Sequence, residues 1–140
     1  MFFTGYCKKK NRERVTGIGG VFLKSKDPKA LAAWYEKHLG IPFGNQLYVD
    51  YVWKNPHNPD VPGHTVFSFF KQDSDYFSPG TSPFMVNFRV KDLHGLLDIL
   101  RKEGVWVDEK VEDYEYGKFG WIMDPDGNKI ELWEPGDEKL

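Results

Sequence analysis

Apolar and polar residues follow two periodicities along this chain, one typical of strands and one typical of helices. A helix is predicted after Asp27-Pro28, which offers an N-cap and a proline at the first helical position, and it ends near Leu39-Gly40. A second helix follows Asp92, and its apolar residues recur with helical spacing up to Gly104. Alternating or apolar stretches predict strands at residues 18–24, 46–54, 65–71, 86–90, 106–113, 118–123 and 129–133.

These elements repeat at a spacing of about 65 residues. Residues 21–27 match residues 86–92, and Gly63-His64-Thr65-Val66-Phe67 matches Gly127-Asn128-Lys129-Ile130-Glu131. Each half has the order βαβββ, which predicts an α+β fold of two tandem modules. One module is too small to bury much core alone, so we expect the two to pair and leave a groove between them.

The chain divides into five segments around one globular domain at residues 15–135. We predict a basic N-terminal arm at 1–14, a first module at 15–77, a linker at 78–83, a second module at 84–135 and a tail at 136–140. The linker is rich in proline, glycine and serine. The arm contains a basic run, which we interpret as a solvated segment and not as a phosphate-binding or membrane-binding element.

Composition excludes some classes of partner. The chain has 140 residues, a formal net charge of −2 and a single cysteine. This charge gives no overall attraction to nucleic acid or to an anionic membrane, so neither is predicted as a partner. One cysteine cannot form an internal disulfide, and no stretch is apolar for long enough to cross a bilayer. A cytoplasmic location is expected.

Two motifs resemble the vicinal-oxygen-chelate superfamily, which contains glyoxalases, extradiol dioxygenases, fosfomycin-resistance enzymes and bleomycin-resistance proteins. They are the strand-Asp-helix-Leu-Gly pattern of residues 25–40 and the ending Asp124-Pro125-Asp126-Gly127-Asn128-Lys129-Ile130-Glu131-Leu132. The resemblance spans about residues 15–135. It implies two βαβββ modules that curl into a curved, partly open, barrel-like sheet. It also implies a homodimer, because many members are dimers.

The same resemblance locates a potential metal site. Metal-dependent members place one His, Gln or Glu ligand on the first and last strand of each module. Transfer of those places gives Gly20, Phe67, Met85 and Glu131, of which only Glu131 suits a divalent ion. Catalytic metal sites usually have three or more protein ligands, so we predict no metal.

Strand alternation predicts what the cup presents instead. The predicted binding residues for a small organic molecule combine aromatic walls with a few polar groups. They are Phe22, Phe67, Phe69, Met85, Asn87, Arg89, Trp121 and Trp133. The opposite face is predicted to lie beneath the helices and carries Val21, Leu23, Val66, Phe70, Val86, Phe88, Val90, Ile130 and Leu132.

Glu131 is the predicted catalytic residue if the protein is an enzyme, since desolvation by aromatic walls would suit it to proton transfer. Its alternative role is a structural ion pair with Arg89. The chemistry would then be that of a glyoxalase-related lyase or isomerase and not of a dioxygenase. In that alternative, Glu131 recruits a divalent metal such as Zn, Ni, Mn or Fe together with His57 or His64. A third hypothesis is a protein-interaction module that uses the aromatic rim.

Overall fold

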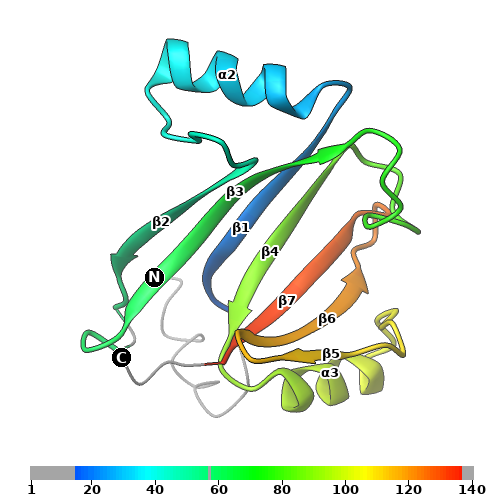
Figure 1. Ribbon diagram of the computed structural model, residues 1–140. Helices are drawn as coiled ribbons and strands as arrows, with labels where there is room; N and C mark the ends of the chain where they lie inside the picture. The colour runs from blue at the N-terminus through cyan, green and yellow to red at the C-terminus, as the bar shows by residue number, and fades with distance from the viewer. Residues whose placement is uncertain (1–14, 57, 137–140) are drawn as a thin grey trace, which may run out of the picture.

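The computed structural model describes residues 15–56 and 58–136. Figure 1 shows one strongly curved mixed sheet, whose seven strands in the described part of the chain have the order β2-β3-β1-β4-β7-β6-β5. The elements are β1 (Val15–Ser25), α2 (Pro28–Leu39), β2 (Tyr48–Lys54), β3 (Pro62–Lys71), β4 (Phe84–Val90), α3 (Leu93–Lys102), β5 (Glu112–Tyr114), β6 (Gly117–Met123) and β7 (Lys129–Pro135).

The sheet reflects the internal repeat. The first strands of the two modules, β1 and β4, pair antiparallel at the centre. Each also pairs in parallel with the last strand of its own module, β1 with β3 and β4 with β7. The sheet does not close, since β2 and β5 lie at its two edges. The predicted α+β fold with a curved, partly open sheet is confirmed.

The two halves differ in the strands that follow the helix. The second half has three, but β5 is short, and residues 106–111 contribute only an isolated bridge between Val107 and Ile122. The predicted strand at 106–113 is interrupted because Asp108 accepts a hydrogen bond from the backbone N–H of Lys110, which bends the chain. The first half has two such strands, β2 and β3.

Both predicted helix starts are confirmed. The side chain of Asp27 accepts a hydrogen bond from the backbone N–H of Ala30 at 3.1 Å, and that of Asp92 does so from Gly95 at 3.1 Å. Gly40 ends α2 in the left-handed conformation, with φ of 69°. No helix among the described residues is long and apolar enough to cross a membrane.

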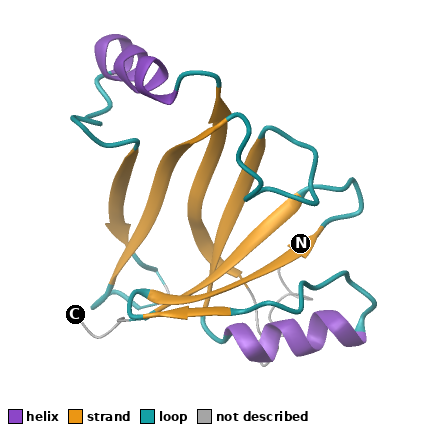
Figure 2. Ribbon diagram, turned by 45° about the vertical axis from the view of Figure 1, so that its right-hand side comes forward, coloured by secondary structure: helices purple, strands orange, loops and turns teal. Residues whose placement is uncertain are grey.

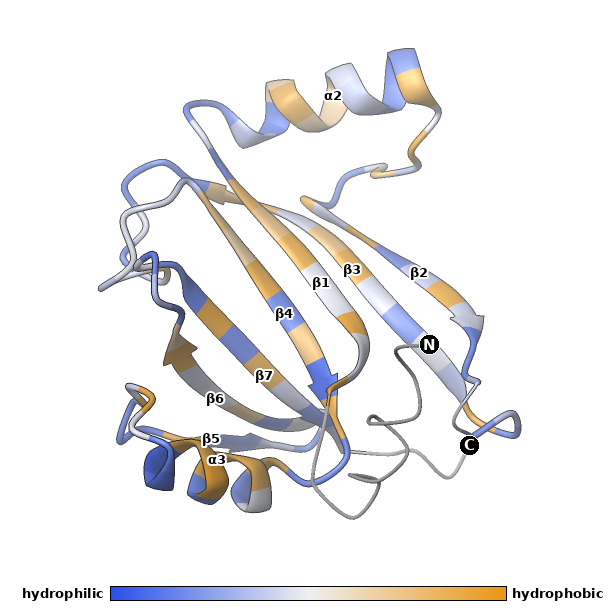
Figure 3. Cartoon of the chain, turned by 180° about the vertical axis from the view of Figure 1, so that it is seen from behind, coloured by the Kyte–Doolittle hydropathy of each residue, from blue (hydrophilic) through white to orange (hydrophobic). Residues whose placement is uncertain are grey.

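The helix α3 covers the outer face of the second half (Figure 2). Its buried leucines pack against strands β4 and β7, which Figure 3 shows as bands of alternating hydropathy. The buried members of this core are Val90, Leu93, Leu96, Leu97 and Leu132. Ile130 and Phe88 pack against it, as the alternation predicts.

The first half is covered differently. Helix α2 lies beyond the ends of β1 and β3 in Figure 1, and the core between helix and sheet includes Phe43 from the segment that follows the helix. Leu31 and Tyr35 reach this core, but the Trp34 side chain is 51% exposed. Helical spacing alone groups Trp34 with Leu31 and Tyr35, so the spacing does not determine which face of α2 is buried. Phe43 contributes a large aromatic side chain to this core from outside the helix.

Candidate functional site

One row of paired residues crosses the sheet and defines its inner face. Strand register places Val66 beside Gly20, Gly20 beside Asn87, Asn87 beside Glu131, and Glu131 beside Trp121. Directly paired residues on neighbouring strands point to the same face of a sheet. The five positions thus come from β3, β1, β4, β7 and β6, and they gather the polar groups of Asn87 and Glu131 at the centre of the curved sheet.

Glu131 is a buried carboxylate with three hydrogen-bond donors. Only 2% of the Glu131 surface is exposed to solvent. Asn87 Nδ2 donates to Oε1 at 2.6 Å, and Trp121 Nε1 donates to Oε2 at 2.9 Å. The Tyr76 hydroxyl also donates to Oε2. Three donors compensate much of the cost of burying the group. The partners of the carboxylate are these side chains and not Arg89, so the predicted ion pair is not formed.

The surroundings of Glu131 perturb several ionisation equilibria. Burial raises the pKa of Glu131, although its hydrogen bonds and the nearby Lys129 act in the opposite direction. Burial, and then the negative charge of Glu131, raises the pKa of the Tyr76 hydroxyl. Desolvation lowers the pKa of Lys129. Its ammonium group lies 5.2 Å from the ring centroid of Trp121 and donates to the Tyr76 carbonyl at 2.7 Å. The arrangement therefore favours the protonated form of the Glu131 carboxyl group more than solvent does.

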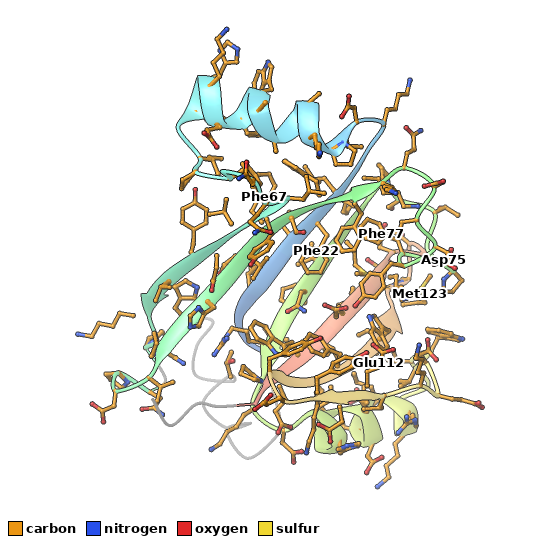
Figure 4. The ribbon with its side chains drawn as sticks, in the orientation of Figure 1. Phe22, Phe67, Asp75, Phe77, Glu112 and Met123 are labelled. Atoms are coloured by element: carbon orange, nitrogen blue, oxygen red, sulfur yellow. The ribbon has the colours of Figure 1, made fainter. Side chains whose placement is uncertain are left out.

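The connection between β3 and β4 packs onto the inner face. Phe77 is 1% exposed and belongs to the same core cluster as Phe22, Met85 and Trp121. Figure 4 shows Phe22 and Phe77 near one another on the concave side of the sheet. The neighbouring Tyr76 delivers its hydroxyl to Glu131. Neither Tyr76 nor Phe77 was predicted as a site residue. The available signal was two consecutive aromatic residues beside a linker, where burial is otherwise uncommon.

Arg89 and Trp133 lie on the inner face beyond Asn87. Arg89 is 2% exposed, and its Cζ lies 5.1 Å from the ring centroid of Trp133 and 5.8 Å from that of Trp53. The Trp133 ring stacks on Phe119 at 5.9 Å. Six predicted binding residues therefore share this face. They are Phe22, Met85, Asn87, Arg89, Trp121 and Trp133.

Phe67 and Phe69 lie on the other face, and their predicted position in the cup is wrong. Both pack in the core beneath α2, where Tyr35 meets the Phe67 ring at 5.4 Å and Phe43 stacks on Phe69 at 5.0 Å. Figure 4 shows Phe67 toward α2, apart from Phe22. Val66 and Phe70, predicted to lie beneath the helix, instead pack against the inner-face cluster.

The faces of β3 were assigned wrongly because the alignment of the two repeats was shifted by one residue in this strand. Val21 pairs with Phe67 just as its counterpart Val86 pairs with Ile130. Phe67 is therefore equivalent to Ile130, and the equivalent of Glu131 is Ser68. The segment 66–70 is apolar at nearly every position, so alternation cannot determine which face each residue occupies.

The residues on the inner face do not fit a divalent metal. Ser68 replaces Phe67 among the four positions that bind the metal in metal-dependent members of the superfamily, and Glu131 is still the only carboxylate among the four. The Glu131 oxygens already accept three hydrogen bonds. His64 Nδ1 contacts the carboxylate of Asp50 on β2 at 2.9 Å. His57 lies outside the described residues. In the described part of the chain, no three His, Cys, Asp or Glu side chains are grouped as metal ligands.

Comparison with known proteins gives one family and one fold. A model of the glyoxalase/bleomycin resistance protein/dioxygenase superfamily matches residues 17–132. The Streptomyces coelicolor methylmalonyl-CoA epimerase in complex with 2-nitronate-propionyl-CoA has a TM-score of 0.64 and 13% identity, over 89% of this chain and 100% of that chain. The Mycobacterium tuberculosis methylmalonyl-CoA epimerase has a TM-score of 0.56 and 21% identity, over 88% of this chain and 90% of that chain.

A superfamily member from Vibrio splendidus 12B01 is also similar, with a TM-score of 0.52 and 13% identity over 88% of this chain and 98% of that chain. No curated protein sequence matches the chain. At these identities the solved structures establish the fold alone. The family match, in contrast, covers both modules and the strands that hold Asn87 and Glu131. The chain belongs to the glyoxalase/bleomycin resistance protein/dioxygenase superfamily.

Proposed function

We propose that this protein binds a small organic molecule on the inner face of its curved sheet, without a metal. The observation that carries the proposal is the buried carboxylate of Glu131, held by Asn87 and Trp121 among aromatic side chains. Such a combination of apolar walls with a few oriented polar groups is typical of small-molecule sites. Fold alone does not identify the ligand, because related scaffolds support different chemistries.

Partly exposed side chains supply the contact surface for the ligand. Phe70, Tyr76 and Phe119 pack around the buried inner-face cluster and are themselves only half-buried. Trp133 is also half-buried and stacks on Phe119. Burial of one ligand ring on these surfaces contributes about 2 to 3 kcal/mol, so micromolar binding requires several such contacts in addition to the polar ones.

A thermal-shift screen tests the proposal. The panel contains aldehyde–thiol adducts, antibiotics and aromatic acids, because a bound compound stabilises the folded state by mass action. Trp133→Phe should reduce the shift given by any active compound, while Trp34→Phe should not, because Trp34 lies on α2 with half of its side chain exposed. Equal losses in both variants, or a panel without any stabilising compound, would contradict the proposal.

Metal content gives an independent measurement. Protein purified without chelators should contain no stoichiometric zinc, nickel, manganese or iron, since the family positions offer only one carboxylate. A stoichiometric metal that is lost in Glu131→Ala would contradict metal-free binding.

The second candidate is a lyase or isomerase in which Glu131 moves a proton. Two observations favour it: burial raises the pKa of Glu131, and two similar structures are epimerases. Turnover that is lost in Glu131→Gln, with ligand binding retained, would establish this function in place of binding alone. Recruitment of a metal through His64 would additionally require that His64 leave Asp50.

We further propose a homodimer located in the cytoplasm. Tyr48 and Val52 on the edge strand β2 are 49% and 61% exposed, and exposed apolar residues on an edge strand favour pairing between chains. The single cysteine agrees with a reducing compartment. Sedimentation analysis tests the dimer. A monomer at all concentrations would exclude it.

A further inference from the structure

The Tyr76 side chain lies on the inner face and places a phenol group against Glu131. Its ring stacks on Phe70 with centroids 5.4 Å apart and an interplanar angle of 8°, and it meets the edge of Trp121 at 6.2 Å. Its hydroxyl donates to Glu131 Oε2. A planar ring that stacks, with a hydroxyl directed at a buried carboxylate, is the contact pattern of a bound phenol.

The three donors to Glu131 differ in how they are held. Asn87 and Trp121 belong to β4 and β6, which directly flank β7 in the sheet. Tyr76 comes from the connection between β3 and β4. Two donors are therefore fixed by the sheet, whereas the third depends on the conformation of one side chain in an irregular segment.

The connection is held in place by contacts other than those of the Tyr76 side chain. Phe77 is 1% exposed and anchors the segment in the inner-face core, and the Tyr76 carbonyl accepts a hydrogen bond from Lys129. The Tyr76 side chain itself is only half-buried. Rotation about its side-chain bonds would expose Glu131 Oε2 and the face of Phe70, while the backbone contacts remain.

We propose that the ligand is a neutral compound with a planar ring and a hydroxyl group, which displaces the Tyr76 side chain and donates its own hydroxyl to Glu131. This inference rests on the proposed function. Glu131 and the Lys129 ammonium, which lies 5.4 Å from the centroid of the Tyr76 ring, carry opposite charges, so together they give little net attraction for a ligand charge of either sign. A neutral hydroxyl forms the hydrogen bond to Glu131 with a smaller desolvation cost than a charged group.

The test uses 4-methylphenol, which reproduces the tyrosine side chain, and 4-methylanisole, which keeps the ring but cannot donate a hydrogen bond. Binding to the full chain is followed by the NMR signal of the Trp121 indole N–H, which shares Glu131 Oε2 with Tyr76. The matched variants are Tyr76→Ala and Tyr51→Ala, because Tyr51 is 46% exposed on the edge strand β2.

We expect 4-methylphenol to shift the Trp121 signal in the wild-type protein and to bind Tyr76→Ala about tenfold more tightly, since no internal ring must be displaced. Tyr51→Ala should bind as the wild type does. 4-Methylanisole should bind Tyr76→Ala about tenfold more weakly than the phenol, and Glu131→Gln in that background should reduce the difference.

Tyr76→Phe keeps the ring and removes the hydroxyl, so it addresses the case in which Tyr76→Ala does not fold. It should bind 4-methylphenol more tightly than the wild type, because the displaced ring no longer holds Glu131. Equal binding of the phenol and the anisole would overturn the inference. If other compounds shift the Trp121 signal of the wild type and phenols do not compete, only this inference fails. If no compound of either kind binds the wild type, the proposed function fails with it.

Discussion

Asn87 and Glu131 lie side by side on the parallel strands β4 and β7, and the Asn87 amide donates to the Glu131 carboxylate at 2.6 Å. Each residue is 2% exposed. The Asn87 Oδ1 atom has no hydrogen-bond partner among the described residues and lies against the backbone of Gly19. A glycine at position 19 therefore provides the space in which Asn87 adopts the orientation that serves Glu131.

Gly19→Ala should disturb this pair. A Cβ at position 19 would lie 2.2 Å from Asn87 Oδ1 and 3.0 Å from both Arg89 Cγ and Trp133 Cε3, so Asn87 must move away from Glu131. We expect the free energy of unfolding to fall by about 2 to 4 kcal/mol through overpacking and the weakened charge-assisted hydrogen bond. Urea unfolding measures this change.

The matched control for Gly19→Ala is Gly120→Ala on β6. Its Cβ would meet the Leu97 Cδ1 methyl group at 3.1 Å, and a leucine side chain can adjust. This variant should lose less than half as much stability, and it should leave the Trp121 indole signal unchanged. Equal effects of the two substitutions would show that Asn87 is not the affected contact.

Much of the fold was predictable because local signals agree with the tertiary structure. The caps at Asp27 and Asp92, the two helices and the final turn are each encoded by neighbouring residues. Alternation also gave the correct faces in the second half, where polar Asn87, Arg89 and Glu131 alternate with apolar residues. The fold and the position of Glu131 follow from these patterns.

The first half was less predictable for a physical reason. Val66, Phe67, Phe69 and Phe70 are apolar on both faces of β3, since one face packs beneath α2 and the other contacts the inner-face cluster. Register then depends on pairing with β1, which local sequence does not specify. Tyr76 was missed because its contact with Glu131 spans 55 positions and arises in an irregular connection.

The corrected position of Phe69 makes a prediction about stability. Phe69 is 3% exposed and packs with Phe43 and Tyr35 on the outer face. Phe69→Ala should reduce the free energy of unfolding by about 3 to 5 kcal/mol, through lost apolar burial and the remaining cavity. At a temperature where the variant is folded, ligand affinity should equal that of the wild type. A selective loss of affinity would place Phe69 in the binding site after all.

Stability should depend on pH through Glu131. Burial raises its pKa in the folded state above the ordinary value of 4.5, so between these two pKa values the folded chain binds more protons than the unfolded chain. The stabilisation from protonated Glu131 is complete below pH 4.5 and is lost as the pH rises through the folded-state pKa. Urea unfolding from pH 4 to 9 should therefore show a destabilising component with rising pH that is absent in Glu131→Gln.

Asp126→Asn is the control for this measurement, because Asp126 is an exposed residue of the turn before β7. It removes one carboxylate, as Glu131→Gln does, but it should preserve the wild-type pH dependence. If Glu131→Gln retains that dependence as well, a different group is responsible for it.

Tyr76 should remain protonated at a pH where exposed tyrosines ionise. Burial and the neighbouring charge of Glu131 both raise the pKa of its hydroxyl above the ordinary value of 10. Folded-state stability from Tyr76 is therefore complete below pH 10 and is lost only as the pH rises through the higher folded-state pKa. The absorbance titration of Tyr76→Phe should match that of the wild type through pH 10 to 11, because the removed phenol does not ionise there. In concentrated urea, where the chain is unfolded and every phenol is exposed, Tyr76→Phe should show an amplitude lower than that of the wild type by about one tyrosine. An equal amplitude loss in the folded proteins would mean that the Tyr76 hydroxyl is accessible to solvent and not held by Glu131.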